Sequence, residues 1–156
     1  GSGSLSYELG ADGANGHLLT QPAGGSRMPA SHETIDERLH YVHMDGGEVF
    51  KFAVRAMERA SLEALKKANM NLEDIDFLIP HQANIRIINS AAKRLKVPTE
   101  RVYVNLDKYG NVSSASIPMA LDEAYHDGLI KKDDVVLLVA FGAGLTWASV
   151  VLKWIK

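Results

Sequence analysis

The sequence predicts an α/β domain in which helices pack on a mixed β-sheet. Amphipathic stretches with helical periodicity alternate with short apolar stretches, and the last two apolar stretches follow one another directly. A helix between two strands favours a right-handed parallel crossover, whereas two strands joined by a short turn favour an antiparallel hairpin. The expected order is therefore helix, strand, helix, strand, helix, strand, strand.

The first 45 residues carry the weakest pattern. Residues 1–4, Gly-Ser-Gly-Ser, have the composition of a flexible linker or a remnant of cloning, and they are set apart from the fold. The segment 5–45 is expected to be irregular and glycine-rich, and it precedes the main domain at 46–156. Its expected parts are a strand at 5–9, a loop at 10–32 and a short strand at 38–44.

The clearest helical pattern spans residues 48–70, where apolar side chains recur at steps of three and four. Gly46 and Gly47 are expected to precede this helix, and Glu48 suits the positive end of its dipole. A second helical pattern covers residues 85–95.

The remaining elements follow in order. Asn84 is the expected N-cap of the second helix. Residues 135–140 are continuously apolar, which is typical of a strand covered on both faces. Residues 141–144 are predicted as the turn of the closing hairpin. The other predicted elements are strands at 77–79, 102–104 and 146–154 and a third helix at 113–126.

The composition excludes several classes of function. Lys and Arg total 17 and Asp and Glu total 19, so the net charge of −2 argues against a general nucleic-acid binder. No cysteine is present, which excludes disulfides, cysteine-ligated zinc and a cysteine nucleophile on this chain. His40 and His43 are three positions apart, but no nearby carboxylate pattern completes a metal-binding set, so no metal site is expected. No run of 18 apolar residues occurs, so no membrane span is expected.

Three segments are expected at the carboxyl ends of the strands, where α/β sheets gather their functional groups. They are residues 80–84, 108–111 and 141–144. Taken singly, each has a plain structural explanation: a hydrogen-bonded His81, an ordinary Gly110-Asn111 turn, and a hairpin that needs glycine.

Taken together and in this order, the motifs resemble the C-terminal half of the β-ketoacyl-acyl-carrier-protein synthase III family. The matching strings are PHQANIRI at 80–87, KYGNVSSASIP at 108–118, AFGAGLTWASVVLKW at 140–154, GGEVFKFAV at 46–54 and LDEAYHDG at 121–128. The resemblance implies a thiolase-like layered domain, one half of an αβαβα sandwich. It also implies an acyltransferase that initiates fatty acid biosynthesis by decarboxylative Claisen condensation in the cytoplasm.

The resemblance also implies roles for particular residues. Members of the family acylate a cysteine from an acyl-CoA primer, decarboxylate malonyl-acyl-carrier protein and join the two fragments. The family's catalytic His and Asn fall on His81 and Asn111, two neutral donors for the enolate oxygen formed by decarboxylation. Gly142 and Ala143 fall on the loop that gives a backbone N–H to the oxyanion hole. Many members read FGGG there, so Ala143 would be strained if its φ were positive.

Substrate contacts are implied in the same way, and no permanently bound cofactor is expected. The positions that match the family's lining of the pantetheine arm, shared by CoA and carrier protein, are Gly46, Gly47, Phe50, Ala83 and Asn84. The positions that match the family's basic patch for acidic acyl-carrier protein are Lys51, Arg86, Lys93 and Arg94. Without the resemblance, these four cations would be interpreted as a solvated helix face.

The family's nucleophilic cysteine belongs to a first half that this sequence lacks. The chain alone is therefore expected to be inactive in acyl transfer, and the intact enzyme is expected to be a homodimer. One alternative function is a non-catalytic module that binds acyl-carrier protein or CoA. Another is a bare folded domain that exposes a partner-facing apolar surface.

Overall fold

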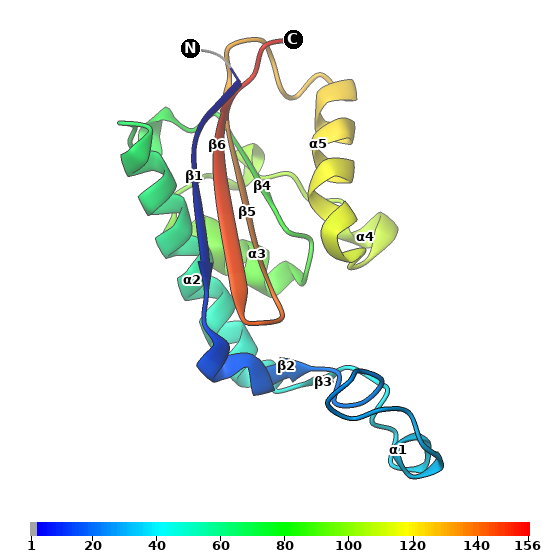
Figure 1. The fold of residues 1–156 in the computed structure, drawn as a ribbon. Helices are drawn as coiled ribbons and strands as arrows, with labels where there is room; N and C mark the ends of the chain where they lie inside the picture. The colour runs from blue at the N-terminus through cyan, green and yellow to red at the C-terminus, as the bar shows by residue number, and fades with distance from the viewer. Residues whose placement is uncertain (1–2) are drawn as a thin grey trace.

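The computed structural model describes residues 3–156 as three layers, with a four-stranded sheet between helices (Figure 1). The strand order is β1-β6-β5-β4, and β4 and β5 are parallel whereas the other pairs are antiparallel. The predicted mixed sheet with helices packed on it is confirmed. The strands are β1 (Gly3–Ala11), β4 (Phe77–Pro80), β5 (Val135–Gly142) and β6 (Thr146–Lys153), and the main helices are α2 (Gly46–Lys67), α3 (Ile85–Arg94) and α5 (Ser116–His126).

Both faces of the central strands are buried. Leu78 and Leu137 pack against α2 and α3 in one core cluster, whereas Phe77 and Val136 join α5 in the other. Successive strand residues point to opposite faces, so a strand between two helical layers has to be apolar at nearly every position. This explains the continuous apolar run in β5.

Helix α2 begins two residues earlier than the sequence predicts. The side chain of Asp45 accepts a hydrogen bond from the Glu48 N–H at 3.0 Å, so Asp45 is the N-cap. Gly46 and Gly47 therefore lie inside the first turn, and not ahead of it. Small buried side chains on this helix, such as Ala60 and Ala64, are fully covered, which allows the helix to approach the sheet closely.

The N-terminal segment is more ordered than expected. Gly3 and Ser4, which the sequence assigns to a linker, pair with β6, and the strand continues to Ala11 rather than ending at 9. Residues 1–2 lie outside the described part of the chain. The predicted loop at 10–32 contains the 3-10 helix η1 (Gly13–Leu18), β2 (Leu19–Thr20) and the start of α1 (His32–Asp36), and the strand predicted at 38–44 is only β3 (His43–Met44). Strands β2 and β3 pair, and this segment extends away from the body of the domain (Figure 1).

The strand predicted at 102–104 is reduced to a single bridge between Val102 and Leu78. The next bond of this parallel ladder would need an N–H from Pro80, which proline lacks, and the buried side chain of Gln82 supplies the missing donor. Its amide nitrogen donates to the Tyr103 carbonyl at 3.2 Å, and its oxygen accepts from the Asn105 N–H at 3.1 Å. This side chain therefore satisfies backbone groups that the strand ladder leaves unpaired.

The remaining elements agree with the sequence except at their ends. The third helix comprises η4 (Ser113–Ala115) followed by α5, and the short helix α4 (Leu106–Tyr109) was not predicted. Phe141 and Gly142 belong to β5, so the hairpin turn is shorter than expected. Two further 3-10 helices are η2 (Leu72–Asp74) and η3 (Thr99–Arg101). Within residues 3–156, no helix has both the length and the apolar character needed to span a membrane.

Candidate functional site

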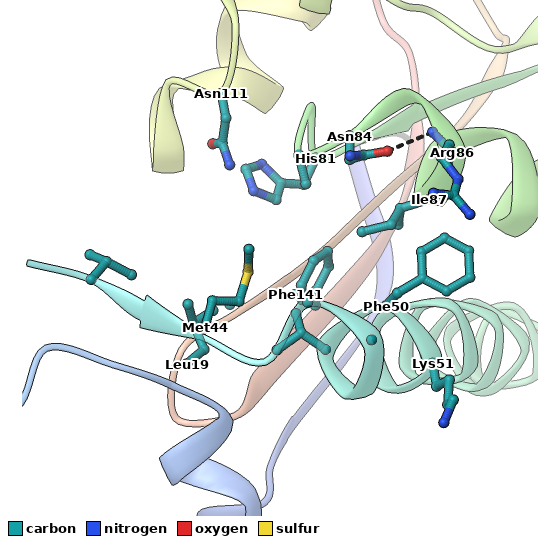
Figure 2. Close-up of a pocket in the computed structure, with 16 residues that line it drawn as sticks. Leu19, Met44, Phe50, Lys51, His81, Asn84, Arg86, Ile87, Asn111 and Phe141 are labelled. Carbon is teal, nitrogen blue, oxygen red and sulfur yellow. Dashed lines mark hydrogen bonds between the residues drawn. The ribbon is translucent and has the colours of Figure 1, made fainter.

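A cavity of about 830 Å³ collects the sequence-predicted site residues. The start of α2, the β4–α3 loop, the Asn111 loop and the end of β5 form its walls (Figure 2). The predicted residues that line it are His81, Asn111, Gly142, Gly46, Gly47, Phe50, Lys51, Ala83, Asn84 and Arg86.

His81 follows β4 directly and is held on several sides. Its backbone N–H donates to the Val139 carbonyl of β5 at 2.8 Å, and its ring meets Phe141 edge-on with 5.9 Å between centroids. The ring nitrogen Nδ1 lies 2.6 Å from the Ser116 hydroxyl on α5. Burial lowers the pKa of the His81 imidazole below its ordinary value, which favours the neutral ring.

Asn111 reaches the same cavity from the loop before α5. Its side-chain oxygen accepts a hydrogen bond from the Ser113 backbone N–H at 3.0 Å. The carboxamide nitrogen is therefore the end of the side chain that faces His81 (Figure 2). Gly110 precedes it with φ +67° and ψ −160°, a combination that favours glycine. The two side chains thus present donor groups to one space.

The glycine-rich turn lies next to the same site. Gly142 lines the cavity, whereas Ala143 lines a neighbouring cavity of about 940 Å³ that also includes His81 and Asn111. Ala143 is not among the residues with positive φ, so the Gly-to-Ala departure carries no backbone strain. Gly144 has φ +137°, and a Cβ there would press on Thr146. Position 144 of this turn therefore requires glycine.

The cavity wall also contains apolar residues that the sequence analysis did not single out. Val42 and Met44 line it from β3 and the residue before it, although 67% and 61% of their surface is exposed. Leu19 on β2 and Ile87 on α3 add to the apolar lining (Figure 2). A periodicity search misses Leu19, Val42 and Met44 because they belong to a short, irregular hairpin. The cavity lining is thus largely apolar.

The four predicted patch cations divide into two sets. Lys51 and Arg86 line the cavity, and Arg86 lies over the Phe50 ring with 5.6 Å from its guanidinium carbon to the centroid. Arg94 forms an ion pair with Glu58 at 2.6 Å, and Lys51 forms one with Glu48 at 2.7 Å. Lys93 is exposed on α3. The structure therefore places Arg86 at the rim and leaves Lys93 and Arg94 outside the cavity lining.

Asn84 has two functions in this arrangement. Its side-chain oxygen accepts the Arg86 backbone N–H at 2.8 Å, which confirms it as the N-cap of α3 (Figure 2). Its carboxamide nitrogen remains available to the cavity. Among residues 3–156, no group of three or more His, Asp or Glu side chains is arranged to hold a metal ion.

Comparison with known proteins assigns the chain to a family. Residues 65–154 match the family described as 3-oxoacyl-[acyl-carrier-protein (ACP)] synthase III C terminal. The chain belongs to this family. A protein of Caldanaerobacter subterraneus called β-ketoacyl-[acyl-carrier-protein] synthase III is 62% identical over 156 residues, all of this chain and 47% of that protein. A protein of Clostridioides difficile with the same name is 59% identical over 152 residues, 97% of this chain and 46% of that protein.

Solved structures of synthase III proteins share the fold. The Thermus thermophilus enzyme is 51% identical with a TM-score of 0.87, over 99% of this chain and 47% of its own. The Aquifex aeolicus enzyme is 42% identical with a TM-score of 0.84, over 98% of this chain and 45% of its own. The thiolase-like fold predicted for this synthase III domain is therefore confirmed. The chain spans about half the length of these relatives.

Proposed function

We propose that this chain is the C-terminal half of a β-ketoacyl-acyl-carrier-protein synthase III. The complete enzyme, in which this chain follows a first half that supplies the cysteine, condenses an acyl-CoA primer with malonyl-acyl-carrier protein. Acetyl-CoA and malonyl-acyl-carrier protein act as substrates, and the reaction takes place in the cytoplasm as the first step of fatty acid synthesis.

The contribution of this half is the decarboxylation site. When the malonyl thioester loses carbon dioxide, the electron pair of the broken C–C bond moves into an enolate whose negative charge lies on the thioester oxygen. His81 and Asn111 each donate an N–H to that oxygen. The enolate carbon then attacks the acyl carbonyl on the cysteine of the first half, and the thiolate leaves. Neutral donors suit this task because they hold the oxyanion without protonating the nucleophilic carbon.

One observation supports this proposal most directly: two neutral donors from different loops face one cavity. The Asn111 side-chain oxygen accepts the Ser113 backbone N–H, which leaves the hydrogens of the Asn111 carboxamide for a ligand. Burial lowers the pKa of His81, so its ring is neutral near pH 7.

The residues proposed to bind the substrate arm and the partner lie around the same site. The apolar cavity beside Gly46, Gly47, Phe50, Ala83 and Asn84 suits the pantetheine tether of CoA and of carrier protein. Gly142 and Ala143 serve the oxyanion of the acyl-cysteine step. Arg86 at the rim, together with Lys51, Lys93 and Arg94, attracts acidic acyl-carrier protein. We further propose that the complete enzyme is a homodimer.

The test is decarboxylation of malonyl-acyl-carrier protein by the complete enzyme with His81→Ala, Asn111→Ala or the exposed His126→Ala. Loss of one preorganised donor lowers the rate by about 10²–10³-fold, equivalent to roughly 3–4 kcal/mol. We expect this loss for the first two variants and none for His126→Ala. Full activity in His81→Ala or in Asn111→Ala would exclude the proposed donor pair.

A second candidate function is a module that binds carrier protein or CoA without chemistry. The observation that favours it is the cavity with Lys51 and Arg86 in its lining, because such a site attracts an acidic partner whether or not chemistry follows. Titration of the chain with malonyl-acyl-carrier protein distinguishes the two. Binding without release of carbon dioxide, in a complete enzyme as well as in this chain, supports the module.

A further inference from the structure

The hydroxyl of Ser116 joins His81 to the first residue of α5. Its oxygen lies 2.6 Å from His81 Nδ1, and it accepts the Gln82 backbone N–H at 3.3 Å. Ser116 is almost completely buried, with 1% of its surface exposed. The sequence predicts only that Ser116 belongs to the helix at 113–126, so this contact is additional to that role.

The direction of the hydrogen bond follows from the available partners. Ser116 carries one hydroxyl proton, and within residues 3–156 its only acceptor at hydrogen-bond distance is His81 Nδ1. If Nδ1 carried a proton, two donors would face each other, or the buried hydroxyl would be left without an acceptor. The Ser116 O–H therefore donates to Nδ1, and the ring proton of neutral His81 resides on Nε2.

From this geometry we propose that Ser116 is a positioning residue that holds His81 as the Nε2–H tautomer. The inference rests on the proposed function, because an Nε2–H is the donor that an enolate oxygen needs. In the opposite tautomer, the Nε2 lone pair would face the developing negative charge and repel it. Ser116 acts through His81, because only 1% of its own surface is exposed.

The same short segment orients the second donor. Ser113 gives its backbone N–H to the Asn111 oxygen, and three residues later Ser116 gives its hydroxyl proton to His81. Both contacts leave an N–H of the partner side chain for the cavity that His81 and Asn111 line. The turn that opens α5 thus fixes the polarity of both donors. Ser113 and Ser116 are absent from the lining of the cavity of about 830 Å³, but both line the neighbouring cavity of about 940 Å³.

The test is direct measurement of the tautomer in the complete enzyme. Selective ¹⁵N-labelling of histidine distinguishes a protonated from a bare ring nitrogen, and the His81 signals are identified by their loss in His81→Ala. We expect Nε2 protonated and Nδ1 bare in the wild type. A wild-type His81 that carries its proton on Nδ1 overturns the proposal, whether or not any variant folds.

The variant Ser116→Ala adds a kinetic readout. We expect a mixture of tautomers and a fall in kcat for malonyl-acyl-carrier protein decarboxylation between about 10- and 100-fold, with KM unchanged. The matched control is Ser61→Ala, which removes another fully buried serine hydroxyl, one that has no hydrogen-bond partner in the described chain. Unchanged tautomer and kcat in Ser116→Ala would overturn the inference. The tautomer is read independently of catalysis, so a wild type with the Nε2–H ring but no decarboxylation would refute the proposed function alone.

Discussion

The Tyr109 hydroxyl donates a hydrogen bond to the Glu123 carboxylate, which ties the end of α4 to the middle of α5. Glu123 also accepts from the Asn105 carboxamide at 2.8 Å and from the Tyr103 hydroxyl at 3.3 Å. These donors, with the one from Tyr109 the largest influence, lower the pKa of the Glu123 carboxyl. Since Asn111 follows Tyr109 by two positions, this carboxylate anchors the loop that carries the second proposed donor.

We expect Glu123→Ala to lower the decarboxylation rate of the complete enzyme by about tenfold, because the Asn111 loop loses its anchor. In an Asn111→Ala background the same change should have little further effect, since neighbouring residues that act through one group are not additive. Rate measurements on the four members of this double-mutant cycle check it. The control is Asp122→Ala, an adjacent acid whose side chain is 73% exposed and pairs with His126. Full additivity would show that Glu123 does not act through Asn111.

The pH dependence follows from His81. Burial lowers the pKa of its imidazole, so the donor stays neutral below the ordinary value of about 6.5. We expect decarboxylation to persist through pH 6.5 and to fall only at more acidic pH. Stability changes in the same direction. As pH falls from about 6.5, the unfolded chain protonates His81 before the folded chain does, so the free energy of unfolding decreases until the pH has passed the folded pKa. A rate profile whose acid limb lies above pH 6.5 would contradict this.

Sequence patterns predicted the long-range architecture because it depends on periodicity. The helical repeat of α2 and the apolar run of β5 report which faces are buried, and both elements occur as predicted except at their ends. The motifs around His81 and Asn111 identified two residues that line one cavity. Local polar chemistry was harder to predict. The side chain of Gln82 satisfies backbone groups at 103 and 105, and no local propensity reveals those contacts.

The contacts that refine the site also escaped sequence reasoning, for a physical reason. Ser116 and Glu123 act through side chains that meet partners 35 and 14 positions away along the chain. Such contacts depend on how the layers pack, which a local pattern does not encode. The apolar wall at Val42 was missed because the hairpin that carries it buries little surface of its own.

A stability prediction concerns Gly10 on β1. Trp147 is its cross-strand neighbour on β6, and a Cβ at Gly10 would clash with the indole ring. The ring is held by Phe52, at 5.7 Å between centroids, and by the Arg59 guanidinium at 4.7 Å, so it has little freedom to move. We expect Gly10→Ala to lower the free energy of unfolding by about 1–3 kcal/mol. Chemical denaturation measures this change. The control Gly13→Ala, where a Cβ meets nothing within 4 Å, should be close to neutral.

The final prediction separates the basic residues by their surroundings. Arg86 stands at the cavity rim over Phe50, whereas Arg94 is paired with Glu58 at 2.6 Å. We expect Arg86→Glu to weaken binding of malonyl-acyl-carrier protein by about tenfold at low salt, with a smaller effect at high salt. Arg94→Glu should weaken it less, because its charge is already partly neutralised, and the exposed Lys132→Glu should leave it unchanged. Calorimetric titration at two ionic strengths measures all three. Equal losses in Arg86→Glu and Lys132→Glu would mean that carrier protein responds to net charge alone and not to a patch at the cavity rim.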